Sequence, residues 1–331
     1  MCTALGISDR LYGRTYDYER SFGEKVISTP RECVEFGVAK NRYAMLGIGV
    51  ESECGPLYFD GVNEWGLWVS ALNFPGFADY PPAKGDGAEI FSGSVVGFLL
   101  GFCRDTSEVK DALRKVKIVG EGKGISSAPL HWMIADERSA LTLECTENGM
   151  KRYDNTVSLL TNSPEFPCQL LRLADYASLS CANPKERLDS LGISAYSRGL
   201  GAIGLPGDYS SSSRFARAFF VKENTRPFES DEPRADGSRR EVGDSLPKSE
   251  VDRFFRIAAS LEIPNGCVIT DEGRPVATRY TCCVDLEFPT IYFTSYENKQ
   301  VRSVKLTEDL MESKSLKTFP LYEKESIRSL N

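Results

Sequence analysis

The chain has 331 residues and a formal net charge of −7. An acidic chain argues against a nucleic-acid-binding surface, and no apolar run approaches the roughly 20 residues that span a bilayer. The start of the chain lacks the basic and then apolar pattern of a signal peptide, so we expect a cytoplasmic protein with no membrane partner.

The first two residues bring two reactive groups together. Methionine aminopeptidases remove Met1 when a small residue follows it, and Cys2 qualifies. The chain would then begin with Cys2, whose thiol is a nucleophile and whose α-amine, titrating near about pH 8, accepts a proton. Met-Cys also begins many chains by chance, so this pattern alone fits both a catalytic and an incidental Cys2.

Two short apolar runs at residues 2–8 and 11–17 are separated by a two-residue turn and predict a tight hairpin. The hairpin returns Arg14 and Asp17 towards the start of the chain. An arginine there favours a thiolate, and a carboxylate orients an amine. Because strict alternation places these two side chains on opposite faces, we expect a bulge or strand end near Thr15.

The next segments predict strands joined by turns, at residues 26–33, 43–50 and 57–73, the last being a hairpin that turns at 63–66. Asn73 closes that hairpin just before Phe-Pro-Gly. It is either a site residue at a strand end or an ordinary turn-forming asparagine.

Residues 92–104 are apolar nearly all round and predict a buried helix, and capping signals predict a second helix from 105 to near 116. Strands are then expected at 130–135, 140–145 and 150–154. His131, the single histidine, lies in the first of these strands. A Cys–His dyad would have to use it; the alternative is a hydrogen-bonded core histidine.

Residues 157–160 predict a strand that ends in the polar sequence Thr-Asn-Ser-Pro, with a helix at 169–179. The glycines at 199, 201 and 204 match a dinucleotide-binding pattern, but no apolar strand precedes them and Leu-Pro-Gly follows where a helix should begin. We interpret this segment as a glycine-rich loop.

A run of serines predicts a helix that starts near Arg214. A cation in the first turn opposes the helix dipole, which suggests that Arg214 pairs with a buried carboxylate or a substrate anion. Residues 222–247 are rich in charge, Pro, Gly and Ser and predict a solvated loop. An amphipathic helix at 249–261, strands at 277–286 and 290–306, and a charged surface tail after 307 complete the chain.

Five motifs occur in order: Met-Cys-Thr at 1–3, Gly-Arg-x-x-Asp at 13–17, Leu-Asn-Phe-Pro-Gly at 72–76, Leu-Thr-Asn-x-Pro at 160–164, and Leu-Pro-Gly-Asp-x-Ser-Ser-x-Ser-Arg-Phe at 205–215. Together they resemble the choloylglycine hydrolases, N-terminal nucleophile amidases that include bile salt hydrolases and penicillin V acylases. The resemblance implies one α+β domain over residues 1–331, an αββα sandwich of two packed, mainly antiparallel sheets. The charged segment at about 222–247 is an insertion relative to the family.

The resemblance also implies a role for each candidate residue. Cys2 is the nucleophile and its amine the proton shuttle, Asp17 holds that amine, and Arg14 lies beside the thiol. The side chain of Asn162 and the backbone of Asn73 resemble the donors to the oxyanion.

Arg214 resembles the arginine that supports the site. The implied reaction is attack of a thiolate on an amide carbonyl through a thioester, which needs no metal or organic cofactor. Members of the family are commonly homotetramers, so we expect a homo-oligomer.

Asn73 resembles the bile salt branch, because the penicillin branch tends to carry an aromatic residue there. We expect a small-molecule amide substrate, a glycine- or taurine-conjugated bile salt. The alternatives are a penicillin V acylase, a general N-acyl amidase such as an acyl-homoserine lactone acylase, and a non-catalytic protein that binds small apolar molecules. The side chains of Tyr16, Phe22, Phe59 and Leu130 either contact the substrate or only fill the core.

Overall fold

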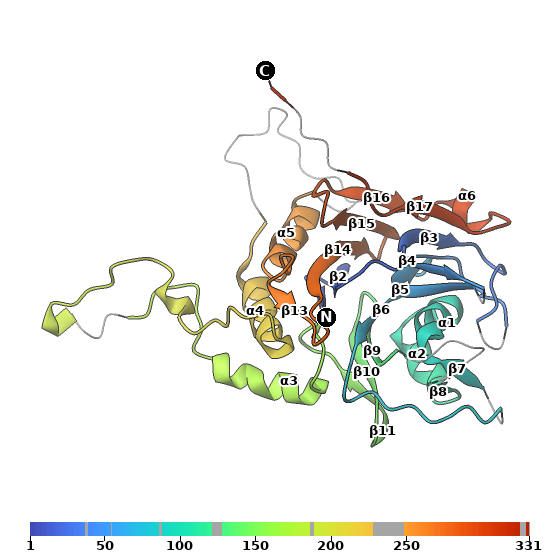
Figure 1. The fold of residues 1–331 in the computed structure, drawn as a ribbon, viewed down its shortest axis with the longest axis horizontal. Helices are drawn as coiled ribbons and strands as arrows, with labels where there is room; N and C mark the ends of the chain where they lie inside the picture. The colour runs from blue at the N-terminus through green and yellow to red at the C-terminus, as the bar shows by residue number, and fades with distance from the viewer. Residues whose placement is uncertain are drawn as a thin grey trace.

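The computed structural model describes residues 1–36, 39–53, 55–85, 88–120, 128–185, 189–227, 248–324 and 329–330. Over these residues, two large antiparallel sheets are stacked on each other, with helices on both outer faces (Figure 1). The predicted αββα arrangement is therefore confirmed.

The first sheet joins the two ends of the chain. Its strands, in sheet order, are β12 (Leu159–Leu160), β1 (Cys2–Gly6), β2 (Leu11–Tyr18), β14 (Pro275–Asp285), β15 (Thr290–Ser295) and β16 (Arg302–Lys305), with β13 (Val268–Ile269) paired to β14. The predicted N-terminal hairpin is β1 and β2. Because β12 and β14 flank it, all of β1 and nearly all of β2 are buried, so the start of the chain lies inside the molecule.

The second sheet carries most of the middle of the chain. Its strands, in sheet order, are β11 (Gly149–Asp154), β10 (Ala140–Thr146), β9 (Leu130–Ala135), β6 (Trp68–Asn73), β5 (Gly55–Asn63), β4 (Met45–Ser52), β3 (Lys25–Thr29) and β17 (Lys317–Pro320). Two details differ from prediction. β3 ends at Thr29, short of residue 33, because Pro30 follows and has no N–H for the ladder. β17 lies in the tail that was expected only to cover the surface, and its short polar sequence gave no strand signal.

Alternation along the strands divides the core into two layers. Trp68, Leu72 and Met133 of the second sheet face Tyr12 and Tyr280 of the first sheet, in the layer between the sheets. The intervening residues of the second sheet pack on α1 (Val95–Phe102) and α2 (Thr106–Ala112).

Helices α4 (Ser211–Asn224) and α5 (Lys248–Ala259) cover the other face of the first sheet (Figure 1). The shorter helices are α3 (Phe166–Arg172) and α6 (Glu308–Met311). α2 ends at Ala112, earlier than expected, because β8 (Lys117–Val119) leaves the helix to pair with β7 (Glu89–Phe91). α3 begins before the predicted residue 169. Of the predicted insertion at 222–247, the first residues extend α4, and residues 228–247 lie outside the described residues.

Candidate active site

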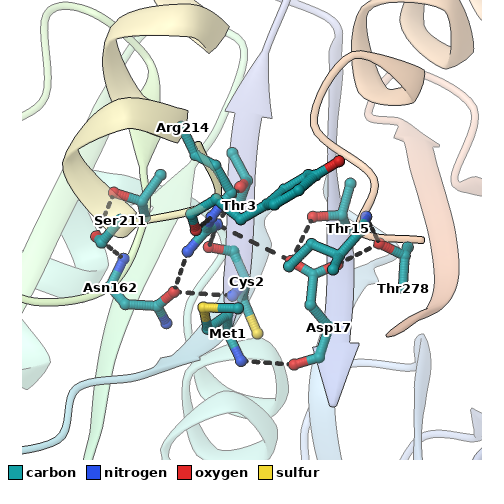
Figure 2. Close-up of polar contacts among 12 residues, drawn as sticks. Met1, Cys2, Thr3, Thr15, Asp17, Asn162, Ser211, Arg214 and Thr278 are labelled. Atoms are coloured by element: carbon teal, nitrogen blue, oxygen red, sulfur yellow. Dashed lines mark hydrogen bonds and ion pairs between the residues drawn. The ribbon is translucent and has the colours of Figure 1, made fainter. Parts of the chain in front are cut away.

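The thiol of Cys2 lies at the first position of β1, between the two sheets. Cys2 is directly opposite Tyr16 on β2, and cross-strand partners share a face of the sheet. Cys2, Arg14 and Tyr16 all line a cavity of about 360 Å³. Met1 precedes Cys2, so the nitrogen of Cys2 is a peptide nitrogen. The Met1 ammonium donates to the Asp17 carbonyl oxygen at 2.5 Å, and the Met1 carbonyl accepts the Asp17 N–H at 2.9 Å (Figure 2 shows the first of these bonds).

Arg14 and Asp17 do lie on opposite faces of β2, as alternation requires. Of the bulge or strand end expected near Thr15, the bulge is absent, because β1 and β2 pair without a shift and the irregularity lies in β14, between Thr278 and Tyr280. The strand end is present, because β1 begins at Cys2, opposite Tyr16. The backbone of Cys2 lies in the plane of the sheet, at the end of its strand. Groups can therefore reach it from both faces, and no bulge is needed.

Asn162, just beyond β12, contacts Cys2 directly. Its Oδ1 accepts the Cys2 N–H at 2.9 Å and an Nη2 hydrogen of Arg214 at 2.7 Å (Figure 2). Two donors on one atom identify that atom as the oxygen. Nδ2 then donates to the Asn73 carbonyl at 2.6 Å and keeps a second hydrogen for another acceptor.

Arg214 is completely buried in the first turns of α4. Its Nη1 donates to the Cys2 carbonyl and to the Thr3 hydroxyl, each at 2.6 Å, and lies 3.9 Å from an oxygen of Asp17. Burial lowers the pKa of Arg214, and the charge of Asp17 opposes this effect. The sequence suggested a buried carboxylate as partner, and the side chain leaves the helix end to meet one.

Asp17 is buried on the helix side of β2. Its two oxygens accept hydrogen bonds from the hydroxyls of Thr278 at 2.6 Å and Thr15 at 3.2 Å. Burial raises the pKa of Asp17, although Arg214 and the N-terminal ammonium act in the opposite direction.

Arg14 occupies the cavity face of β2. Its Nη1 donates to the carbonyls of Ala71 at 2.6 Å and Phe59 at 3.1 Å, and lies 3.8 Å from Asp60. Burial acts to lower the pKa of Arg14, but the negative charges around it, beginning with a Cys2 thiolate, outweigh burial and raise this pKa. Nη2 has no partner among the described residues. A cation with an unused donor beside the thiol favours the thiolate.

The cavity is mainly apolar and aromatic. All four predicted substrate contacts line it, together with Tyr18, which alternation from Tyr16 could have indicated. The ring of Tyr16 stacks on Phe59, with centroids 5.1 Å apart. A space of this kind accepts an apolar ring system next to the thiol.

The residues that sequence reasoning missed are small and polar. Ser211 accepts the Asn162 N–H at 2.9 Å and donates to Thr161 at 2.9 Å, while Thr278 comes from a strand more than 250 positions away. The serine run at 210–213 was the only available signal for the first contact. In the described part of the chain, no three His, Cys, Asp or Glu side chains are placed to hold a metal ion. No described helix has the length and apolar character needed to cross a bilayer.

Comparison with known proteins gives a consistent result. The profile of the choloylglycine hydrolase family, described as linear amide C–N hydrolases, matches residues 2–319. The bile salt hydrolase/transferase of Lactiplantibacillus plantarum is 35% identical, and the alignment covers 97% of each chain. The crystal structure of the C2A mutant of the conjugated bile acid hydrolase from Clostridium perfringens superposes with a TM-score of 0.86, at 29% identity over 100% of both chains.

Penicillin V acylase from Agrobacterium tumefaciens shares the fold, with a TM-score of 0.73 at 19% identity over 97% of this chain and 91% of that one. The motifs, the αββα sandwich and the match over nearly the whole length agree with one another. The chain belongs to the choloylglycine hydrolase family of linear amide C–N hydrolases, which have the N-terminal nucleophile hydrolase fold.

Proposed function

We propose that this protein hydrolyses the amide bond of glycine- or taurine-conjugated bile salts. The observation that carries the proposal is the position of Cys2, which lines an apolar cavity and whose backbone N–H bonds to the side chain of Asn162. Relatives that match over nearly the full length are named bile salt hydrolase/transferase. The motif Leu-Asn-Phe-Pro-Gly around Asn73 also resembles the bile salt branch.

The proposed reaction begins when Met1 is removed and the α-amine of Cys2 becomes free. The thiol gives its proton to this amine, the thiolate attacks the amide carbonyl, and the carbon–sulfur bond forms as the carbonyl electrons move to oxygen. The second Nδ2 hydrogen of Asn162 and the backbone N–H of Asn73 stabilise this oxyanion. As the tetrahedral intermediate collapses, the carbon–nitrogen bond breaks and the α-ammonium protonates the departing glycine or taurine nitrogen.

Water then completes the cycle. The amine takes a proton from water, the resulting hydroxide attacks the thioester, and the free bile acid leaves as the thiolate is restored. Asp17 holds the amine in this scheme. Arg14 stabilises the thiolate, and Arg214 keeps Asn162 in place.

The aromatic walls of the cavity support a fused apolar ring system as the acyl part of the substrate. In this proposal Tyr16, Phe22, Phe59 and Leu130 contact that ring system. The polar amino-acid part would then lie towards the cavity entrance. A penicillin V acylase shares the fold but at 19% identity, so the bile salt reading has the stronger support.

The test is mass-spectrometric detection of glycine or taurine released from a panel of conjugates. We expect release by the wild-type protein and none by Cys2→Ala, and an intact mass that lacks Met1. If the wild type releases nothing from bile salts but cleaves penicillin V, the substrate is wrong and the mechanism stands. If Cys2→Ala is fully active, or if active protein retains Met1, the mechanism itself is wrong.

We also propose that residues 1–331 form one catalytic domain of a cytoplasmic homotetramer. Large apolar side chains are exposed at the end of α3 and in the segment between α3 and α4, which supports burial against another subunit. They are Leu171, Leu191, Ile193, Tyr196 and Ile203. Light scattering coupled to size-exclusion chromatography would measure the mass, and Tyr196→Asp is expected to reduce it. Cell fractionation would test the location.

A further inference from the structure

His131 contacts the two chain segments that carry the proposed oxyanion donors, Asn73 and Asn162. It is completely buried, and its ring stacks on Phe74 with centroids 4.2 Å apart and planes 5° apart. Its Nε2 lies 2.8 Å from the carbonyl oxygen of Thr161. The ring therefore contacts the residue after Asn73 and the residue before Asn162, although these two segments are far apart in sequence.

The contacts of the ring determine where its protons are. A carbonyl oxygen only accepts, so Nε2 must carry a hydrogen. Nδ1 lies 3.2 Å from Oε1 of Glu144, and one of these two atoms must supply the hydrogen between them. Either an imidazolium donates to a carboxylate or a carboxyl group donates to a neutral ring. In both cases the ring keeps its hydrogen on Nε2.

Glu144 is equally buried and belongs to the neighbouring strand β10. Its Oε1 also accepts the N–H of Phe166, the first residue of α3, at 3.0 Å. The N–H at the start of α3 thus fixes the carboxyl group of Glu144, and this carboxyl group contacts the Nδ1 side of the ring. Neither Glu144 nor His131 lines the cavity.

We infer that His131 and Glu144 are positioning residues that fix the oxyanion donors of the reaction proposed above, and the inference rests on that reaction. The Nε2 hydrogen of His131 holds the carbonyl oxygen of Thr161, and Glu144 holds the ring through Nδ1. If the side chain at position 131 cannot donate, the buried carbonyl oxygen of Thr161 loses this bond and the peptide that leads into Asn162 shifts.

Two substitutions at position 131 separate this hydrogen bond from packing. The amide of His131→Gln can reach the place of Nε2 and donate to Thr161, whereas His131→Met has a similar volume and cannot donate. We expect His131→Met to lower kcat about 10- to 100-fold, as a small misplacement of a reacting group does, with KM within about twofold. His131→Gln should stay within about threefold of the wild-type kcat. His131→Leu also cannot donate to Thr161, so it should match His131→Met, and it serves if that variant does not fold.

Thr142→Val is the matched control. Thr142 is on the same strand, two residues before Glu144, is also completely buried, and bonds only to the side chain of Asn155, at 2.9 Å. This change should lower stability but leave kcat unchanged. Alkylation of Cys2 by iodoacetamide forms no oxyanion, so its rate should be equal in all the variants.

The chain has one histidine, so the protonation state of the ring can be observed directly. In tag-free protein labelled with ¹⁵N-histidine, NMR should show a hydrogen on Nε2 in the wild type and in Thr142→Val. A wild-type ring without a hydrogen on Nε2, equal kcat values for His131→Met and wild type, or equal losses in the Met and Gln variants would overturn the inference. A wild type that is alkylated at Cys2 but hydrolyses no conjugate would overturn the proposed function, and the inferred role with it.

Discussion

Arg214 donates to the side-chain oxygen of Asn162 at 2.7 Å and to the backbone carbonyl of Cys2 at 2.6 Å, so one guanidinium group holds both ends of the proposed catalytic centre. The two bonds come from different nitrogens of its planar fork, which sets the distance between the residues it joins. A lysine in the same place would keep the charge near Asp17 but not this geometry.

We therefore expect Arg214→Lys to lower kcat by about 10²-fold, close to the loss of one oxyanion donor, with little change in KM. Steady-state kinetics on one conjugated substrate would measure it. Arg217→Lys is the control, because Arg217 lies one turn further along α4 and donates only to the carbonyls of Pro206, Asp208 and Ser260. An equal loss of kcat in both variants would contradict a specific role for Arg214.

The buried carboxyl group of Asp17 should lower the stability of the protein near neutral pH, although the proposed reaction needs it. Because burial raises its pKa above the ordinary value of 3.8, its contribution to stability is fully present below that value and is lost as the pH rises through the raised pKa. Asp17→Asn removes this titration. We expect the variant to be more stable than the wild type near neutral pH and to lose the advantage as the pH falls towards about 4.

Urea denaturation of both proteins at several pH values would measure this difference, and the variant should be nearly inactive because the proposed support of the amine is gone. A stability difference that does not change with pH would show that the carboxyl group has no raised pKa.

A second buried carboxylate, Asp60, belongs to β5 of the second sheet and faces Arg14 of β2. Asp60 accepts the hydroxyl of Tyr280 at 2.7 Å and the thiol of Cys282 at 3.4 Å, and it lies 3.8 Å from Arg14. Burial raises its pKa, while Arg14 and Tyr280 lower it. The hydroxyl group of Tyr280 is thus the closest neutral hydrogen-bond donor to the carboxyl group of Asp60.

Tyr280→Phe should destabilise the protein by about 1.5–3 kcal/mol, the usual value of a hydrogen bond to a charged group. Tyr58→Phe is the matched control: its hydroxyl bonds to the neutral hydroxyl of Thr29 at 2.6 Å, so about 1 kcal/mol is expected. Chemical denaturation would give both free energies of unfolding. A smaller loss for Tyr280→Phe than for Tyr58→Phe would contradict an ionised Asp60.

The features that could be predicted from the sequence are those that depend on residues close together along the chain. The hairpin of β1 and β2 follows from two apolar runs and a short turn, and the sites of Asn73 and Asn162 follow from strands that end in polar residues. The serine cap placed the start of α4 to within a few residues. The six candidate catalytic residues could be predicted as one set because all of them lie in the family motifs.

The partners of these residues could not be predicted, because they depend on tertiary packing. Thr278 reaches Asp17 only after the C-terminal strand pairs with β2, and nothing near Thr278 signals a carboxylate. The bulge considered near Thr15 is absent because Cys2 lies at the end of its strand, where groups reach its backbone from both faces. The sequence left His131 as either a dyad member or a core histidine, because its contacts with Thr161 and Glu144 require three separate segments to meet.

The C-terminal tail provides a last example, because it contacts a wall of the cavity. Tyr322, just after β17, donates to Glu24 at 2.8 Å, and the same carboxylate accepts the N–H of Phe22 at 3.0 Å and the hydroxyl of Ser21. Glu24 is 2% exposed, and Phe22 lines the cavity. The tail therefore fixes the turn that presents the ring of Phe22.

We expect Tyr322→Phe to raise KM about three- to tenfold, because a loosened wall contacts the substrate less well, and to leave kcat within about twofold, because no group near Cys2 changes. Tyr296→Phe is the control: its hydroxyl accepts the N–H of Asn265 at 3.1 Å, in an exposed position, and it does not line the cavity. Kinetics with a full-length conjugate would test the pair. A fall in kcat with unchanged KM would show that the tail acts on the reacting groups, whereas the hydrogen bond to Glu24 predicts an effect on the shape of the cavity alone.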